Sequence, residues 1–263
     1  MLVLIRDTAD EGSNIAASLV ARALKNQPTL TLGLAAGDTV IGLYRNLVDR
    51  HRSGVLDFSC ARFFSLDELL GLPKDSPHTY RSFFHRHLVD HINIDQTRLF
   101  FVGGETMKDP ALYCASYEDI IRVQGGIALQ ILGIGENGHL GFNEPGCSLN
   151  SRTRLTLLMP SSREDVARSM ENQGTVRWAI TMGLATIREA NVLLLLAFGK
   201  HKAEAVAKAL EGPITASLPA SSIQLHPTVI VVLDREASSL LTNQDFYFEQ
   251  ACELSSLLPG WLK

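Results

Sequence analysis

The chain has 263 residues, of which 46% are apolar and 20% charged, the composition of an ordinary globular protein long enough to bury a sizeable core. Its formal net charge of −4 argues against a general nucleic-acid-binding protein, which needs a basic surface to neutralise phosphates. No apolar run approaches the roughly 18 residues of a membrane span, and residues 1–10 lack the pattern of a secretory signal, so we expect a cytoplasmic protein without a nucleic-acid or membrane partner.

Short apolar runs alternate with helix-like segments along the chain. In chain order, the pattern predicts strand 1–5, helix 13–25 with Ser13 as its cap, strand 30–34, helix 40–51, strand 61–66, helices 80–91 and 110–123, strands 127–134, 178–182 and 192–198, helix 200–210, strand 228–233 and helix 246–258. Such a pattern predicts a mostly parallel sheet covered by helices on both faces. Because no repeat or linker interrupts it, we expect one α/β domain over residues 1–263, with a candidate mobile flap around residues 158–180.

Polar segments follow four of the predicted strands, at residues 35–39, 67–68, 133–144 and 199–202. In parallel α/β folds, ligands bind beyond the carboxyl ends of the strands. These four segments are therefore the candidate site.

The first of these segments, with the residues just before it, reads Gly-Leu-Ala-Ala-Gly-Asp-Thr over residues 33–39. Glycine at a strand end lets the backbone approach a ligand, and the following helix offers free amides to an anion. The segment is neither a dinucleotide fingerprint nor a P-loop. The alternative is an ordinary tight turn from strand to helix.

Two adjacent carboxylates, Asp67 and Glu68, follow the third predicted strand. Adjacent residues of an extended chain point to opposite faces, so these two side chains are expected to have different roles. One of them could serve as a general base at the strand end. The alternative is that both are solvated or cap the next segment.

Residues 133–145 contain four glycines together with His139, Asn143 and Glu144. Histidine moves protons near neutral pH, and a carboxylate can orient it and stabilise its charged form. A metal site is disfavoured, because one histidine and one glutamate are too few ligands. A purely structural histidine is the alternative.

Basic residues that could bind a phosphate follow this segment. They are Arg152, Arg154, Arg163, Arg168, Lys200 and Lys202. Scattered surface charge is the alternative for most of them. Histidines 78, 85, 87 and 91 are expected to be surface or packing residues, and the four widely spaced cysteines to be small buried or half-buried fillers rather than zinc ligands or disulfides.

Residues 133–145 resemble the signature LGIG-x-[ND]-G-H-[IL]-[AG]-FNEP of the glucosamine-6-phosphate deaminase family. Segments 65–73, 76–84, 148–154, 199–203 and 224–227 are similar to other segments of that family in order and spacing. The related 6-phosphogluconolactonases continue differently after Gly-His. The resemblance covers roughly residues 1 to 240, and it implies a Rossmann-like α/β fold.

The resemblance also implies a reaction, in which glucosamine 6-phosphate and water give fructose 6-phosphate and ammonia without a cofactor or metal. By this resemblance, Asp67 moves the C2 proton to C1 of the opened sugar. His139 drives ring opening, and Asn137 and Glu144 orient it. The resemblance assigns the phosphate to Ala36, Gly37, Asp38, Thr39, Arg168 and Lys202. The partner is then a small amino-sugar phosphate, and the protein is a monomer or a homo-oligomer.

This sequence departs from the family pattern at three places. Position 137 is Asn, where some members have Asp. In the phosphate loop, Ala36 removes a hydroxyl and Asp38 adds a carboxylate, which is unfavourable if it faces a phosphate. Cys147 and Thr156 replace residues of the family's allosteric site. The same chemistry on galactosamine 6-phosphate, and a non-catalytic sugar-phosphate sensor, are the alternative functions.

Overall fold

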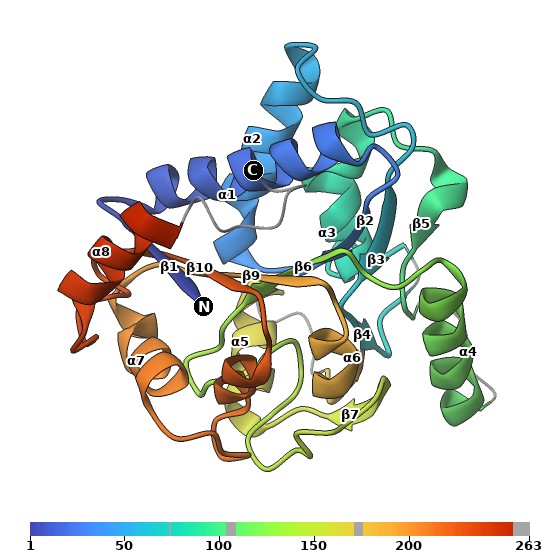
Figure 1. Ribbon diagram of the computed structural model, residues 1–263. Helices are drawn as coiled ribbons and strands as arrows, with labels where there is room; N and C mark the ends of the chain where they lie inside the picture. The colour runs from blue at the N-terminus through green and yellow to red at the C-terminus, as the bar shows by residue number, and fades with distance from the viewer. Residues whose placement is uncertain (74, 104–108, 171–175, 255–263) are drawn as a thin grey trace.

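The computed structural model describes residues 1–73, 75–103, 109–170 and 176–254. A seven-stranded sheet forms its centre, with α1, α2 and α3 above it and α5, α6 and α7 below it in Figure 1. All of the pairings in this sheet are parallel, which confirms the predicted α/β class. In spatial order, the strands are β1 (Leu2–Arg6), β10 (Val229–Asp234), β9 (Val192–Ala197), β6 (Leu129–Gly133), β2 (Thr31–Leu34), β3 (Arg62–Ser65) and β5 (Leu99–Phe100).

The chain order of the strands reverses between β2 and β6. From β2 the chain proceeds to β3 and β5 on one side, and from β6 it proceeds to β9 and β10 on the other. Such a reversal opens a crevice at the carboxyl ends of the strands, where ligands of doubly wound folds bind. Every residue of β9 and β10 is buried, so this half of the sheet anchors the core.

The helices cover both faces of the sheet. They are α1 (Ala9–Asn26), α2 (Asp38–Arg52), α3 (Tyr80–His87), α4 (Pro110–Val123), α5 (Pro160–Ser169), α6 (Leu184–Arg188), α7 (Ala203–Glu211) and α8 (Gln244–Leu254). Short 3₁₀ turns occupy Val89–His91, Gln96–Arg98, Lys200–Lys202 and Pro219–Leu225. They divide two of the predicted helices, since residues 80–91 and 200–210 each combine an α-helix with a 3₁₀ turn.

The first helix begins earlier than its sequence pattern predicts. The Thr8 side chain accepts a hydrogen bond from the Glu11 amide and caps α1, while Asp10 and Glu11 lie in the first turn. Both features favour a helix start. Ser13 is buried within the helix, so the prediction that it caps the helix was wrong.

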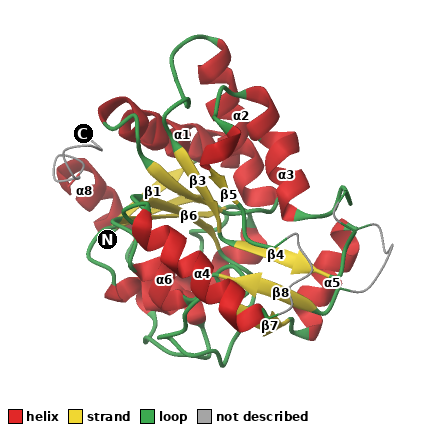
Figure 2. Ribbon diagram, turned by 90° about the vertical axis from the view of Figure 1, so that its right-hand side faces the viewer, coloured by secondary structure: helices red, strands yellow, loops and turns green. Residues whose placement is uncertain are grey.

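A second, three-stranded antiparallel sheet lies beside the first (Figure 2) and was not predicted. Its strands are β4 (Asp67–Leu70), β8 (Trp178–Thr181) and β7 (Arg154–Leu157), in that order. Leu66 joins the sheets, because its amide donates to the Leu34 carbonyl of β2 and its own carbonyl accepts from the Met182 amide. Asp67 therefore begins a new strand instead of ending the previous one.

The predicted flap around residues 158–180 contains α5 and the first residues of β8, and residues 171–175 lie outside the described structure. The last residues of the predicted helix 246–258 also lie outside it. Cys114 is buried and Cys147 half-buried, but Cys60 and Cys252 are exposed, so the prediction of buried fillers was wrong for these two.

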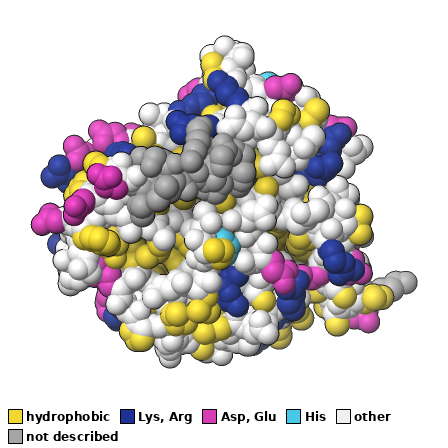
Figure 3. Space-filling view, viewed as in Figure 1, with side chains coloured by type: hydrophobic (Ala, Val, Ile, Leu, Met, Phe, Trp, Pro, Cys, Tyr) yellow, Lys and Arg dark blue, Asp and Glu magenta, His cyan; other side chains and the backbone are white. Residues whose placement is uncertain are grey.

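Charges of both signs are spread over the described part of the face shown in Figure 3. Within the described ranges, no helix is both long and apolar enough to cross a membrane.

Candidate active site

A cavity of about 680 Å³ opens at the carboxyl ends of β2 and β6. All four of the predicted polar segments contribute to it, although they are far apart in the sequence. The lining residues from these segments are Ala35–Thr39, Asp67, Gly133, Ile134, Gly135, Glu136, His139, Gly141, Phe142, His201 and Lys202. Helices α3 and α5 complete the wall. The four strand ends thus lie together around one cavity, and their role as a site stays a prediction.

The N-terminus of α2 forms one part of the cavity wall. Gly37 precedes the helix with φ +108°, a backbone angle that favours glycine, and no side chain in the described part of the chain caps α2. Ala36, Gly37, Asp38 and Thr39 all line the cavity. The first-turn amides and the positive end of the helix dipole can therefore serve an anion.

Asp67 lies at the start of β4 and faces the cavity, with only 5% of its surface exposed. Burial, and secondarily the neighbouring charge of Glu68, raise the pKa of the Asp67 carboxyl well above its usual value. Gly141 approaches it closely, since a Cβ at that position would lie 3.2 Å from Asp67 Oδ2. A desolvated carboxylate with a raised pKa is suited to accept a proton from carbon.

Glu68 points away from the cavity and has a different role from Asp67, as the strand alternation predicts. Its carboxylate accepts hydrogen bonds of 2.8 Å from the backbone amides of Leu69, Tyr80 and Arg81. The last two amides belong to the first turn of α3. Glu68 therefore holds the N-terminus of this helix against β4.

The loop after β6 holds His139 beside Glu144. His139 Nδ1 lies 3.6 Å from Glu144 Oε2, and Asn137 Nδ2 donates to the same oxygen at 3.1 Å. Glu144 Oε1 accepts from the Met159 amide at 3.2 Å. His139 lines the cavity, Asn137 joins it in lining an adjoining cavity of about 240 Å³, and Glu144 lies behind both.

Two opposing effects act on the His139 imidazole. Burial lowers its pKa, whereas the Glu144 carboxylate opposes this, and the net result is a lowered pKa. Among the described residues, Nδ1 has no hydrogen-bond partner. An imidazole that is mostly neutral and next to a carboxylate can accept a proton and be stabilised once it carries one.

Asn143, the other polar residue of this loop, is fully buried. Its side-chain amide donates to the carbonyls of Leu140 and Met182, and its oxygen accepts from Arg154 at 2.8 Å. These bonds fix the loop to the second sheet, so Asn143 has a structural role.

The predicted basic residues separate into two groups. Only Arg168 of α5 and Lys202 line the cavity. Arg168 forms an ion pair with Asp165. Burial lowers the pKa of Lys202, while Glu136, Asp165 and Asp38 oppose that effect.

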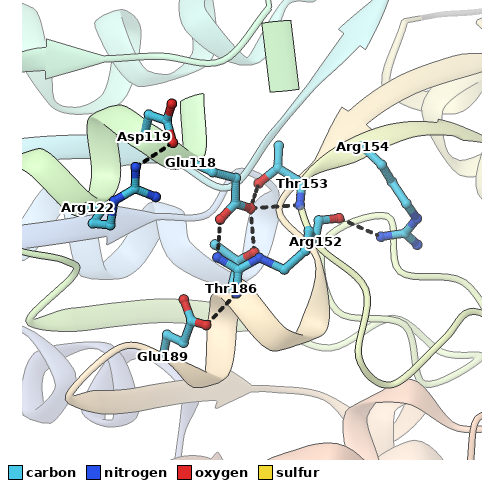
Figure 4. Close-up of polar contacts among 8 residues, drawn as sticks. All are labelled: Glu118, Asp119, Arg122, Arg152, Thr153, Arg154, Thr186 and Glu189. Carbon is cyan, nitrogen blue, oxygen red and sulfur yellow. Dashed lines mark hydrogen bonds and ion pairs between the residues drawn. The ribbon is translucent and has the colours of Figure 1, made fainter. Parts of the chain in front are cut away.

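The other predicted arginines are used within the fold. Arg152 forms ion pairs with Glu118 and Glu189 (Figure 4). Arg163 donates to the Leu158 carbonyl, and Arg154 bonds to Asn143. These three arginines therefore contact other protein groups instead of lining the cavity, and we no longer interpret them as phosphate ligands.

Several cavity residues lie outside the site predicted from the sequence, and His78, Tyr80 and His87 are among them. His78 and His87 line the cavity, and His87 also packs as expected, with its ring 4.5 Å from the Phe83 ring between centroids. Tyr80 lines it as well, and its ring stacks on Phe142 at a centroid distance of 5.9 Å. The available signal for His78 and Tyr80 was their position in segment 76–84, which resembles a family motif, whereas His87 lies beyond that segment. In the described ranges, no group of three or more His, Cys, Asp or Glu residues is placed to hold a metal ion.

Comparisons with known proteins agree with this geometry. Residues 6–231 match the family model of glucosamine-6-phosphate isomerases and 6-phosphogluconolactonases. A glucosamine-6-phosphate deaminase of Rhodococcus jostii is 46% identical over 94% of this chain and 95% of its own length. One from Shewanella woodyi is 40% identical over the full length of both proteins.

Solved structures give the same result. A monomeric glucosamine-6-phosphate deaminase is 41% identical, with a TM-score of 0.88 over 91% of this chain and 100% of the other. A 6-phosphogluconolactonase from Trypanosoma brucei shares the fold at 21% identity, with a TM-score of 0.74 over 92% of this chain and 98% of its own. The chain belongs to the glucosamine-6-phosphate isomerase and 6-phosphogluconolactonase family.

Proposed function

We propose that this protein is a glucosamine-6-phosphate deaminase, which converts glucosamine 6-phosphate and water to fructose 6-phosphate and ammonia. The relatives named as deaminases support this over a lactonase, since they are 40–46% identical over nearly the whole chain. The 6-phosphogluconolactonase structure from Trypanosoma brucei is 21% identical and supports only the fold.

One observation carries the proposal. A single cavity is lined by the buried carboxyl of Asp67, the imidazole of His139, and two cations, Arg168 and Lys202. The reaction needs a base for a carbon-bound proton, a proton carrier for ring opening and an anion site, and these residue types supply all three.

Ring opening comes first and uses His139. The imidazole takes the proton of the C1 hydroxyl and returns a proton to the ring oxygen as the C1–O5 bond breaks, which leaves the open aldehyde. Glu144 stabilises the transient positive charge, and Asn137 orients Glu144 through its 3.1 Å hydrogen bond.

Isomerisation and ammonia loss follow at Asp67. Its carboxylate removes the proton from C2, and the C2–H electron pair forms the C1=C2 bond of an enolamine as the C1 carbonyl oxygen takes a proton from water. Asp67 then delivers its proton to C1, while the amine nitrogen releases a proton to water and forms a double bond to C2. The product is an imine at C2, which water attacks to give fructose 6-phosphate and ammonia. The carbonyl and imine of the substrate accept the electron pairs, so the scheme requires no cofactor.

The phosphate is assigned to the N-terminus of α2 with Arg168 and Lys202. Gly37, Asp38 and Thr39 offer backbone amides, and Ala36 shapes the turn before them. The Asp38 side chain lines the same cavity, so it contributes a negative charge near the bound phosphate. The proposal also includes a cytoplasmic location and a monomeric or homo-oligomeric protein. It further includes a movable segment around residues 158–180.

The variant Asp67→Asn tests the assignment of the base. It should lower kcat by about 10²- to 10⁴-fold while leaving the affinity for glucosamine 6-phosphate nearly unchanged. Glu68→Gln is the control, because Glu68 faces away from the cavity and should retain most of the activity. Ammonia release and calorimetric titration are the measurements.

A thermal melt of Asp67→Asn is needed to check that the variant is folded. Since burial raises the pKa of Asp67, the folded state binds its proton more tightly than the unfolded state. Stability then falls as pH rises from the unfolded-state pKa of about 4 toward the raised pKa. The Asn variant lacks this loss and should melt at a higher temperature than the wild type at neutral pH. Full activity in the variant would remove Asp67 from the base role.

A further inference from the structure

The cavity assigned to the phosphate is lined by carboxylates as well as by cations. Besides Arg168 and Lys202, it is lined by the carboxylates of Asp38, Glu136 and Asp165. A phosphate dianion gains most from cations that lack another anion. This charge balance therefore requires an explanation.

Of the three carboxylates, Asp165 interacts most directly with the cations. It forms an ion pair with Arg168 one turn later on α5, and both side chains line the large cavity and the adjoining small one. Asp38 and Glu136 have no ion-pair partner in the described part of the chain. Among the three carboxylates, Asp165 is thus the one already bound to a proposed phosphate ligand.

The charge of Asp165 also reaches Lys202 and His139. Its carboxylate raises the pKa of Lys202 against the effect of burial, together with Glu136 and Asp38. The same carboxylate also acts to raise the pKa of His139, although its contribution is smaller than that of Glu144. Asp165 therefore pairs with Arg168 and also acts electrostatically on Lys202 and His139.

We propose that Asp165 takes the place of the substrate phosphate in the ligand-free protein, pairing with Arg168 in the cavity that Lys202 also lines, and thereby sets the affinity for the phosphorylated sugar. A phosphate that enters this end of the cavity competes with the Asp165 carboxylate for the same cations and is repelled by its charge. Asp165 is a specificity-determining residue in this role, and the identity of the phosphate as that of a sugar rests on the function proposed above.

Asp165→Asn separates this role from a structural one. Calorimetric titration with inorganic phosphate should show an affinity only roughly two- to fivefold higher than in the wild type, because the competing ion pair is exposed to solvent. Asp165→Glu keeps the charge and should bind phosphate as the wild type does. The gain in Asp165→Asn should shrink as salt is added.

Glu164→Gln is the matched control. Glu164 precedes Asp165 on α5 and lines only the smaller cavity, so its neutralisation should leave phosphate affinity unchanged. In turnover, Asp165→Asn should lower KM for glucosamine 6-phosphate by a factor similar to the gain in phosphate affinity, with kcat within about twofold.

The outcomes distinguish this inference from the proposed function. Equal phosphate affinity in wild type and Asp165→Asn would overturn it, as would an equal gain in Glu164→Gln. If glucosamine 6-phosphate is not turned over but Asp165→Asn still binds phosphate more tightly than both controls, the proposed reaction fails and the role of Asp165 stands.

Discussion

At the scale of single residues, the site depends on close contacts that only small or buried groups permit. Gly135 shows this most directly, because a Cβ there would lie 2.3 Å from Cε1 of His139. The backbone at Gly135 is outside the positive-φ region. Glycine is therefore needed at this position for the imidazole and not for the turn.

This contact predicts the effect of Gly135→Ala. The added methyl group should push the His139 ring away from Glu144, which lowers kcat by roughly tenfold or more. The melting temperature should change little, because the ring is the free end of a side chain that can rotate away. Steady-state kinetics and thermal melts measure the two effects, and unchanged kcat would contradict the placement of His139.

The sequence predicted some residue roles better than others. The opposite directions of Asp67 and Glu68 followed from strand alternation alone. The inclusion of His78 and His87 in the cavity did not, since it depends on how α3 docks beside α2. Arg152 and Arg154 could not be excluded from the phosphate site without knowledge of Glu118 and Asn143, which are distant in sequence or buried.

At the scale of elements, the hydrophobic pattern of the sequence did not predict the second, three-stranded sheet. Strand β7 reads Arg-Leu-Thr-Leu and β4 reads Asp-Glu-Leu-Leu, which are short and partly polar runs. They become strands because both pair with β8. Long apolar strands such as β9 and β10 were predicted within two residues, since burial on both faces dictates their composition.

Helix α4 is joined to the second sheet and to α6 through one carboxylate. Glu118 accepts hydrogen bonds from the Thr153 amide and hydroxyl and from the Thr186 hydroxyl, and it pairs with Arg152 (Figure 4). Thr153 directly precedes β7. This cluster therefore holds the outer strand of the sheet on which Asp67 lies.

The variant Glu118→Gln should lower the free energy of unfolding by about 1–3 kcal/mol, because a neutral amide cannot accept all of these bonds. Asp119→Asn is a matched control on the same helix, since Asp119 pairs with Arg122 at the surface and should contribute at most about 1 kcal/mol. Urea denaturation followed by circular dichroism compares them. Equal losses in the two variants would show that the cluster adds no stability of its own.

At the scale of the whole molecule, the topology creates the site. The reversal of strand order between β2 and β6 brings the α2 N-terminus against the His139 loop. The passage of the chain at Leu66 from one sheet to the other brings Asp67 into the same cavity. Four polar strand ends could be read from the sequence, but their meeting in one cavity depends on strand order, which periodicity does not encode.

The most direct test of this account is ammonia release by the purified protein from glucosamine 6-phosphate, without added metal or nucleotide. We expect one ammonia for each fructose 6-phosphate formed, with kcat reduced by about 10²- to 10⁴-fold in Asp67→Asn. Galactosamine 6-phosphate, measured alongside, gives the preference at C4. A folded protein that binds these sugars but releases ammonia from neither would contradict the proposed reaction and favour a sugar-phosphate sensor.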